Sequence, residues 1–108
     1  VSSPPRKRFL KEARAVAAMS HENIVTIFAV EELPVPYLAM ELISGKTLQE
    51  KLRNSGPMEV SEILHIGRQI AAGLAAAHAK NLIHRDIKPG NILLEDTADQ
   101  KVKLTDFG

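Results

Sequence analysis

The feature that most constrains this chain of 108 residues is a pair of short polar motifs in its second half. The first reads HRDIKPGN at residues 84–91, and the second reads TDFG at residues 105–108. Asn91 follows Asp86 by five positions and Asp106 follows it by twenty, so two carboxylates and an amide stand at fixed offsets. Two short apolar runs joined by a polar turn separate the motifs, which predicts strands over residues 92–94 and 102–104.

Composition narrows the class of protein. The 44% hydrophobic and 25% charged content is typical of a soluble globular domain. A net charge of +1 gives no reason to expect a nucleic-acid partner. The absence of cysteine excludes a disulfide framework and a thiolate metal site. No apolar run approaches the roughly 18 residues of a membrane span, so we expect no membrane segment in this chain. The lack of cysteine suits an intracellular, cytoplasmic location.

Hydrophobic periodicity predicts the remaining elements. Helical spacing indicates a helix over residues 6–20, and β-branched runs indicate an antiparallel hairpin of strands at 24–30 and 37–42. A short helix follows at 47–54. A long helix with Ser61 as its N-cap extends to about Lys80. The apolar stripe predicted to bury the long helix is Ile63, Ile66, Ile70, Leu74 and Ala77.

Two glycines, Gly67 and Gly73, lie inside the predicted long helix. Each costs on the order of 1 kcal/mol relative to alanine. We expect them to permit the close approach of a neighbouring helix.

The two motifs resemble the catalytic loop H-R-D-x-K-x-x-N and the metal-binding D-F-G of protein kinases. The order of predicted elements is similar to the middle of such a domain, from the αC helix to the start of the activation segment. The resemblance implies an α+β, partial protein-kinase-like two-lobe fold over residues 1–108. It implies a small-lobe portion at 1–42, and a hinge and large-lobe portion at 43–108. Residues 45–48, 71–78 and 88–91 look like those of bacterial, eukaryotic-like serine/threonine kinases.

The resemblance assigns catalytic and metal-binding roles. Asp86 would orient the acceptor hydroxyl and take its proton, and Lys88 would contact the transferring phosphate. Asn91 and Asp106 would be magnesium ligands, because hard oxygen donors suit that ion. The residues alone also allow purely structural or surface roles, such as an aspartate in a turn or a solvated loop lysine.

Further residues would bind the nucleotide. Glu12 would pair with a nucleotide-orienting lysine, and Met40 would stand at the back of the adenine pocket. The backbone of Glu41 and Ile43 would contact adenine, with Leu93 beneath the purine. Core packing explains Met40 and Leu93 equally well from the residues alone.

The implied activity is transfer of the ATP γ-phosphoryl group to serine or threonine hydroxyls of a protein substrate, with magnesium. The chain opens on Val1 and stops at Gly108, and it contains neither a glycine-rich loop nor the third-strand lysine. We therefore expect it to be an internal piece of a kinase, inactive in isolation, whose parent protein could carry a membrane anchor. A pseudokinase or kinase-like binding module is the alternative. Aminoglycoside-type phosphotransferases are a weaker match, because they lack Lys88 and the Asp-Phe-Gly motif.

Overall fold

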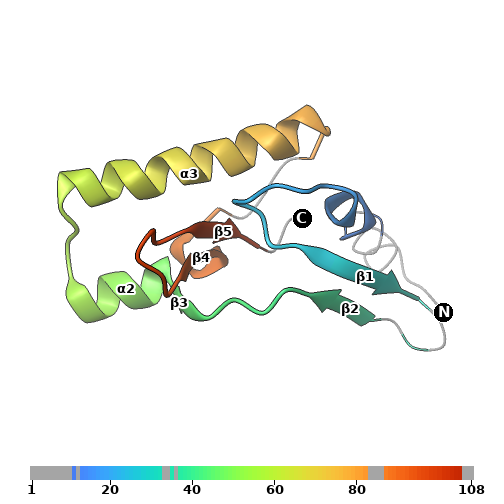
Figure 1. Cartoon of the computed structure of the whole chain (residues 1–108), viewed down its shortest axis with the longest axis horizontal. Coiled ribbons are helices and arrows are strands. Elements are labelled where there is room, and N and C mark those ends of the chain that lie inside the picture. Colours follow the sequence, from blue (N-terminus) through green and yellow to red (C-terminus); the bar gives the residue numbers. More distant parts are fainter. Residues whose placement is uncertain (1–10, 12, 33–34, 36, 83–86, 106–108) are drawn as a thin grey trace.

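The computed structural model of the chain describes residues 11, 13–32, 35, 37–82 and 87–105. Residues 13–17 are helical, and the long helix and the strands follow in an α+β arrangement (Figure 1). The named elements are β1 (Ile27–Glu31), β2 (Tyr37–Met40), β3 (Gly45–Thr47), α2 (Leu48–Ser55), α3 (Val60–Ala79), the 3₁₀ turn η1 (Pro89–Asn91), β4 (Ile92–Glu95) and β5 (Val102–Leu104).

The strands form two small antiparallel sheets. In the first, β1 pairs with β2 with Ile27 opposite Met40, which confirms the predicted hairpin. The strand begins three residues later than predicted, because Ile24 instead forms an isolated bridge to Leu104. The second sheet has the order β3-β4-β5.

Strand β3 is not predicted from the sequence, because Gly45 there indicates the end of the preceding strand. A Cβ atom at this position would lie 1.9 Å from the carbonyl oxygen of Leu94. Glycine therefore allows β3 to lie against β4, where a side chain would block the approach.

The helices begin and end for different reasons. Thr47 and Glu50 form a capping box at α2, with the Glu50 N–H donating to Thr47 Oγ1 (3.1 Å) and the Thr47 N–H donating to Glu50 Oε1 (2.9 Å). Gly56 ends the helix at a φ of 72°. The predicted N-cap of α3 is wrong: Glu59 occupies that position without a side-chain cap bond. The preceding Met58 is partly buried and packs against the core.

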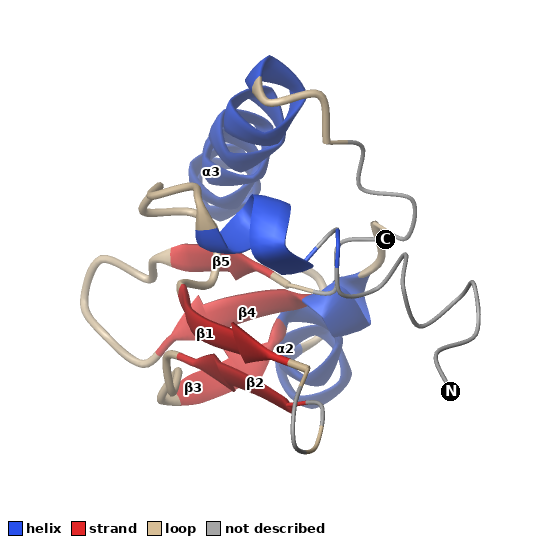
Figure 2. Cartoon of the chain, turned by 90° about the vertical axis from the view of Figure 1, so that its right-hand side faces the viewer, coloured by secondary structure: helices blue, strands red, loops and turns tan. Residues whose placement is uncertain are grey.

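The main core lies between the second sheet and the helices α2 and α3 (Figure 2). The predicted stripe supplies Ile66, which is buried, while Ile70 and Leu74 are partly buried and pack against the cluster. Ile63 is 49% exposed, so the described residues cover the predicted stripe only in part. A 20-residue helix spans about 30 Å, whereas the strands have only three or four residues and do not extend under its first turns. The buried members of the cluster are Leu48, Ile66, Ile92, Leu94, Val102 and Leu104.

Asn23 joins the loop before β1 to the large helix and the second sheet. Its Nδ2 donates to the Val102 carbonyl (2.9 Å) and to Gln69 Oε1 (3.1 Å), and its own carbonyl accepts from the Leu104 N–H (2.8 Å). Gln69 Oε1 also accepts from the Val102 N–H (2.9 Å). Asn23 is 3% exposed, and within the described ranges no buried side-chain polar atom lacks a partner. The loop is therefore held by satisfied, water-excluded hydrogen bonds.

Gly73 allows α3 to lie close to β5 and to the loop that contains Asn23. A Cβ atom there would lie 2.8 Å from Leu104 Cδ1 and 3.0 Å from the Asn23 carbonyl oxygen. The predicted close approach is therefore present, although the partners are a strand and a loop and not another helix. At Gly67 a Cβ atom would meet nothing within 4 Å, so the described residues make no close approach there.

Gly73→Ala and Gly67→Ala form a matched pair for testing this contact. We expect Gly73→Ala to destabilise, because Leu104 is fully buried and a backbone carbonyl cannot give way. The overpacking cost of about 1–3 kcal/mol exceeds or cancels the gain in helix propensity. Gly67→Ala keeps only that gain and should stabilise by about 0.5–1 kcal/mol. Thermal unfolding of both variants in the full-length protein measures the difference, and equal shifts would contradict the packing argument.

Candidate functional site

The site begins where the start of β4 lies beside the end of β5. Asn91 closes η1 immediately before β4, and Thr105 follows β5. Because Ile92 pairs with Leu104, the antiparallel register places Asn91 opposite Thr105, and the Thr105 N–H donates to the Asn91 carbonyl (3.2 Å). Asn91 is 7% exposed, and its N–H donates to the Lys88 carbonyl (2.9 Å). The two polar motifs are thus joined by a backbone hydrogen bond.

The predicted catalytic residues fall partly on this junction. Lys88 is exposed and extended (φ −155°, ψ 160°) just before η1, with its carbonyl held by Asn91. Asp86, Asp106 and Glu12 lie outside the described residues, and their predicted roles stay predictions.

Leu93 lies on the face of the second sheet opposite the core. Along β4 the burial alternates, with Ile92 and Leu94 in the core and Leu93 half-buried on the other side. Lys103 is the register partner of Leu93 on β5, so their side chains share this face. The predicted purine floor is therefore turned away from the hydrophobic core.

The predicted hinge follows β2. Met40 ends the strand and is 46% exposed, and Ile43 is half-buried. The Glu41 N–H donates to the Thr26 carbonyl (2.9 Å), and Glu41 Oε1 accepts from the Thr26 N–H (2.7 Å). Glu41 is thus fixed on both its backbone and its side chain to the residue before β1.

Lys103 completes the surroundings of Glu41. Its Nζ lies 3.3 Å from Glu41 Oε1, and the two side chains are 10% and 22% exposed. Burial alone would raise the pKa of Glu41, but the Thr26 N–H and the Lys103 ammonium outweigh it, so the pKa lies below its ordinary value. The Glu41 carboxylate is therefore ionised and paired with Lys103 on β5.

Sequence reasoning did not single out Thr26 or Lys103. The available signal was a lysine between Val102 and Leu104 in a short apolar strand, which indicates a charged side chain on the second face of a buried sheet. Its partner is remote in sequence, so the pairing with Glu41 required the structure.

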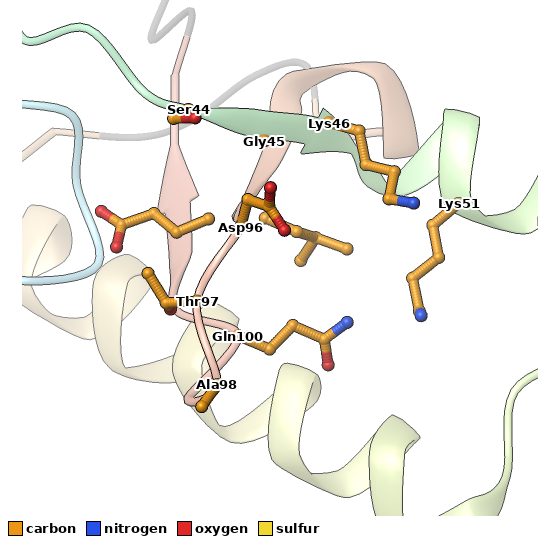
Figure 3. A pocket seen from close by; sticks show the side chains of 10 residues that line it. Ser44, Gly45, Lys46, Lys51, Asp96, Thr97, Ala98 and Gln100 are labelled. Carbon is orange, nitrogen blue, oxygen red and sulfur yellow. The ribbon is translucent and has the colours of Figure 1, made fainter.

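A separate cavity of about 690 Å³ lies beside the turn that joins β4 to β5 (Figure 3). Its walls come from β3, from Lys51 on α2, and from the turn itself. None of the predicted nucleotide-binding residues lines it, so this cavity is distinct from the predicted adenine site. Its lining residues are Ser44, Gly45, Lys46, Lys51, Leu94, Glu95, Asp96, Thr97, Ala98 and Gln100.

Two further kinds of feature are absent among the described residues. Within the part of the chain that the structure describes, no three His, Cys, Asp or Glu side chains gather as a metal cluster. The described helices include none that is both long and apolar enough to cross a membrane.

Comparison with known sequences decides the family. The sequence matches the protein kinase domain family over residues 2–108. The chain belongs to the protein kinase domain family.

The curated relatives that it matches include bacterial serine/threonine kinases. The kinase chain is 41% identical over 103 residues to the serine/threonine-protein kinase PrkC of Bacillus subtilis, covering 94% of this chain and 16% of PrkC. It is 46% identical over 102 residues to PknL of Mycobacterium tuberculosis, covering 94% of this chain and 25% of PknL. The chain therefore spans about a sixth to a quarter of the length of these relatives.

A solved structure shows the same fold. The kinase chain superimposes with a TM-score of 0.85 and 30% identity on Rad53 1-466, crystallised in complex with AMP-PNP. The match covers 98% of this chain and 29% of that one. The expected α+β, partial kinase fold is confirmed.

The lowered pKa of Glu41 gives this kinase chain a pH-dependent element. A carboxyl group whose pKa falls on folding stabilises the folded state fully above its unfolded value, near 4.5, and loses that contribution as pH falls through the lowered value. We expect Glu41→Gln to destabilise the full-length protein more at pH 7 than at pH 3.5. Thermal unfolding at both pH values checks this, with Glu59→Gln as an exposed control. The same loss at both pH values would contradict it.

Proposed function

We propose that the full-length protein containing this sequence is a serine/threonine protein kinase that transfers the ATP γ-phosphoryl group to protein serine or threonine hydroxyls, with magnesium. The observation that carries the proposal is the Thr105–Asn91 hydrogen bond. It joins Thr105, which directly precedes the Asp-Phe-Gly motif, to Asn91 at the end of the catalytic-loop motif, and this supports a shared metal–phosphate site. The similarity to PrkC and PknL supports the serine/threonine class.

Catalysis of phosphoryl transfer depends mainly on position and charge. We assign Asp86 to orienting the acceptor hydroxyl and receiving its proton, and Lys88 to the transferring phosphate. The exposure of Lys88 beside η1 supports its assignment, because the side chain can reach a substrate there. A compact ammonium suits a migrating phosphoryl group, since it does not demand a bidentate partner.

Asn91 and Asp106 are assigned to magnesium, which would neutralise charge on the nucleotide phosphates when bound. The fit rests on donor chemistry: an amide and a carboxylate oxygen from adjoining segments are hard ligands, and magnesium completes its shell with water and phosphate. The near-complete burial of Asn91 and its backbone bond to Lys88 hold this residue in place, which supports its assignment as a ligand.

The adenine site is assigned to the hinge and the outer face of β4. The backbone carbonyl of Glu41 and the N–H of Ile43 would meet the base, with Met40 behind it and Leu93 beneath it. The outward face of Leu93 supports this arrangement. Rad53 bound to AMP-PNP shows that a chain of this fold takes an adenine nucleotide.

The remaining assignments follow from the same proposal. Glu12 would pair with a lysine that this chain does not contain. Residues 1–42 would belong to the small lobe, and residues 43–108 to the hinge and large lobe. The catalytic part would work in the cytoplasm, where ATP is available.

Asp86→Asn and Asp106→Asn separate the two carboxylate roles. In the full-length protein we expect Asp86→Asn to reduce turnover by about 10²–10⁴-fold while ATP affinity stays within a few-fold, because Asp86 acts on the acceptor. Asp106→Asn should weaken magnesium–nucleotide binding as well as turnover. Steady-state kinetics with a serine peptide and nucleotide titrations measure both. Small and equal effects of the two substitutions would refute the assignment.

The chain of residues 1–108 gives a simpler test. It contains no glycine-rich loop and no third-strand lysine, so positioning of the phosphates is incomplete and we expect no phosphotransfer from it. Incubating the purified chain with labelled Mg-ATP and a protein substrate checks this. Turnover comparable to that of the full-length protein would show that the missing parts are unnecessary.

A further inference from the structure

The junction between Thr26 and Glu41 departs from a regular antiparallel ladder. The register of β1 and β2 places these two residues opposite each other, just beyond the Ile27–Met40 pair. In a hydrogen-bonded pair each residue donates its N–H to the backbone carbonyl of the other. The Glu41 N–H follows this rule, whereas the Thr26 N–H bonds to the Glu41 carboxylate at 2.7 Å.

This exchange has a chemical consequence for the Glu41 backbone. In a regular ladder the Thr26 N–H would donate to the Glu41 backbone carbonyl. Here it donates to the Glu41 carboxylate instead. That carbonyl is then left for a donor from outside the sheet. It is also the atom that the proposed function assigns to the adenine base.

Lys103 holds the carboxylate in this role. Lys103 is 8% exposed. Among the described residues the buried polar side chains are Asn23, Asn91 and Lys103, and of these three Lys103 carries a charge. Its Nζ lies 3.3 Å from the same Oε1 atom that accepts from Thr26. The opposite charges, largely shielded from water, keep the carboxylate at the Thr26 N–H.

We propose that Glu41 and Lys103 are positioning residues for adenine recognition: the Lys103-anchored carboxylate of Glu41 takes the Thr26 N–H and so reserves the Glu41 backbone carbonyl for the 6-amino group of ATP. This inference rests on the proposed function and adds a determinant of nucleotide specificity to it. Lys103 lies on the Leu93 face of β5, so one face of the sheet supplies both the floor of the adenine site and the anchor of its hinge.

The test compares ATP with purine riboside triphosphate, which lacks only the 6-amino group. In the full-length protein the wild-type KM for the analogue should exceed that for ATP by about 2- to 10-fold, the value of one net hydrogen bond. In Glu41→Ala and Lys103→Met this ratio should fall toward one. The first variant removes the carboxylate and the second removes its anchor, so in both the Thr26 N–H can bond to the backbone carbonyl of residue 41. Lys103→Arg should keep the wild-type ratio.

Lys51→Met is the matched control. Lys51 pairs with Glu62 at 2.9 Å between α2 and α3, with side chains 15% and 31% exposed, so its loss breaks a comparable ion pair away from the hinge. We expect lower thermal stability with an unchanged KM ratio. Should Glu41→Ala not fold, Lys103→Met and Glu41→Gln carry the comparison, with Glu41→Gln expected to fall between wild type and Lys103→Met.

The outcomes separate the two proposals. A wild-type ratio retained in Glu41→Ala and Lys103→Met, even with reduced kcat, would show that the pair only stabilises the fold. A wild-type ratio of one would remove the carbonyl from adenine recognition and overturn the inference. A full-length protein that transfers no phosphoryl group from either nucleotide would refute the proposed function, and the inference with it.

Discussion

The buried amide of Asn23 is the interaction on which the arrangement of this chain depends. It bonds at once to β5 and to Gln69 on α3, and the Asn23 backbone carbonyl receives the N–H of Leu104. An amide that loses such partners inside a protein costs about 1–3 kcal/mol for each unsatisfied group. Because the same strand ends beside Asn91, the network also sets where the two polar motifs meet.

The sequence predicts the elements well where their pattern is local. The hairpin of β1 and β2, the short helix α2 and the strands β4 and β5 follow from β-branched runs and apolar spacing. The errors arise where tertiary contacts decide. Ile24 leaves its strand to bridge Leu104, and Gly45 extends into β3 against Leu94.

The candidate site divides in the same way. The sequence predicts that the two motifs lie before and after a pair of short strands. In the structure this pairing places Asn91 beside Thr105, the first residue of the second motif. The hydrogen-bond and ion-pair partners of Glu41 could not be predicted from the sequence. Its partners Thr26 and Lys103 lie 15 and 62 positions away, and ion pairing between distant lysines and glutamates has no local pattern.

The loop before β1 is bonded to elements that come much later in the chain. Residues 23–25 precede β1 and would be counted with the small lobe, yet the Val25 N–H donates to the Leu104 carbonyl (3.0 Å) and Asn23 is bonded to α3 and β5. A rigid body defined by these bonds contains the loop, α3 and the second sheet. Residues 23–25 are therefore anchored to α3 and the second sheet before the ribbon of β1 and β2 begins.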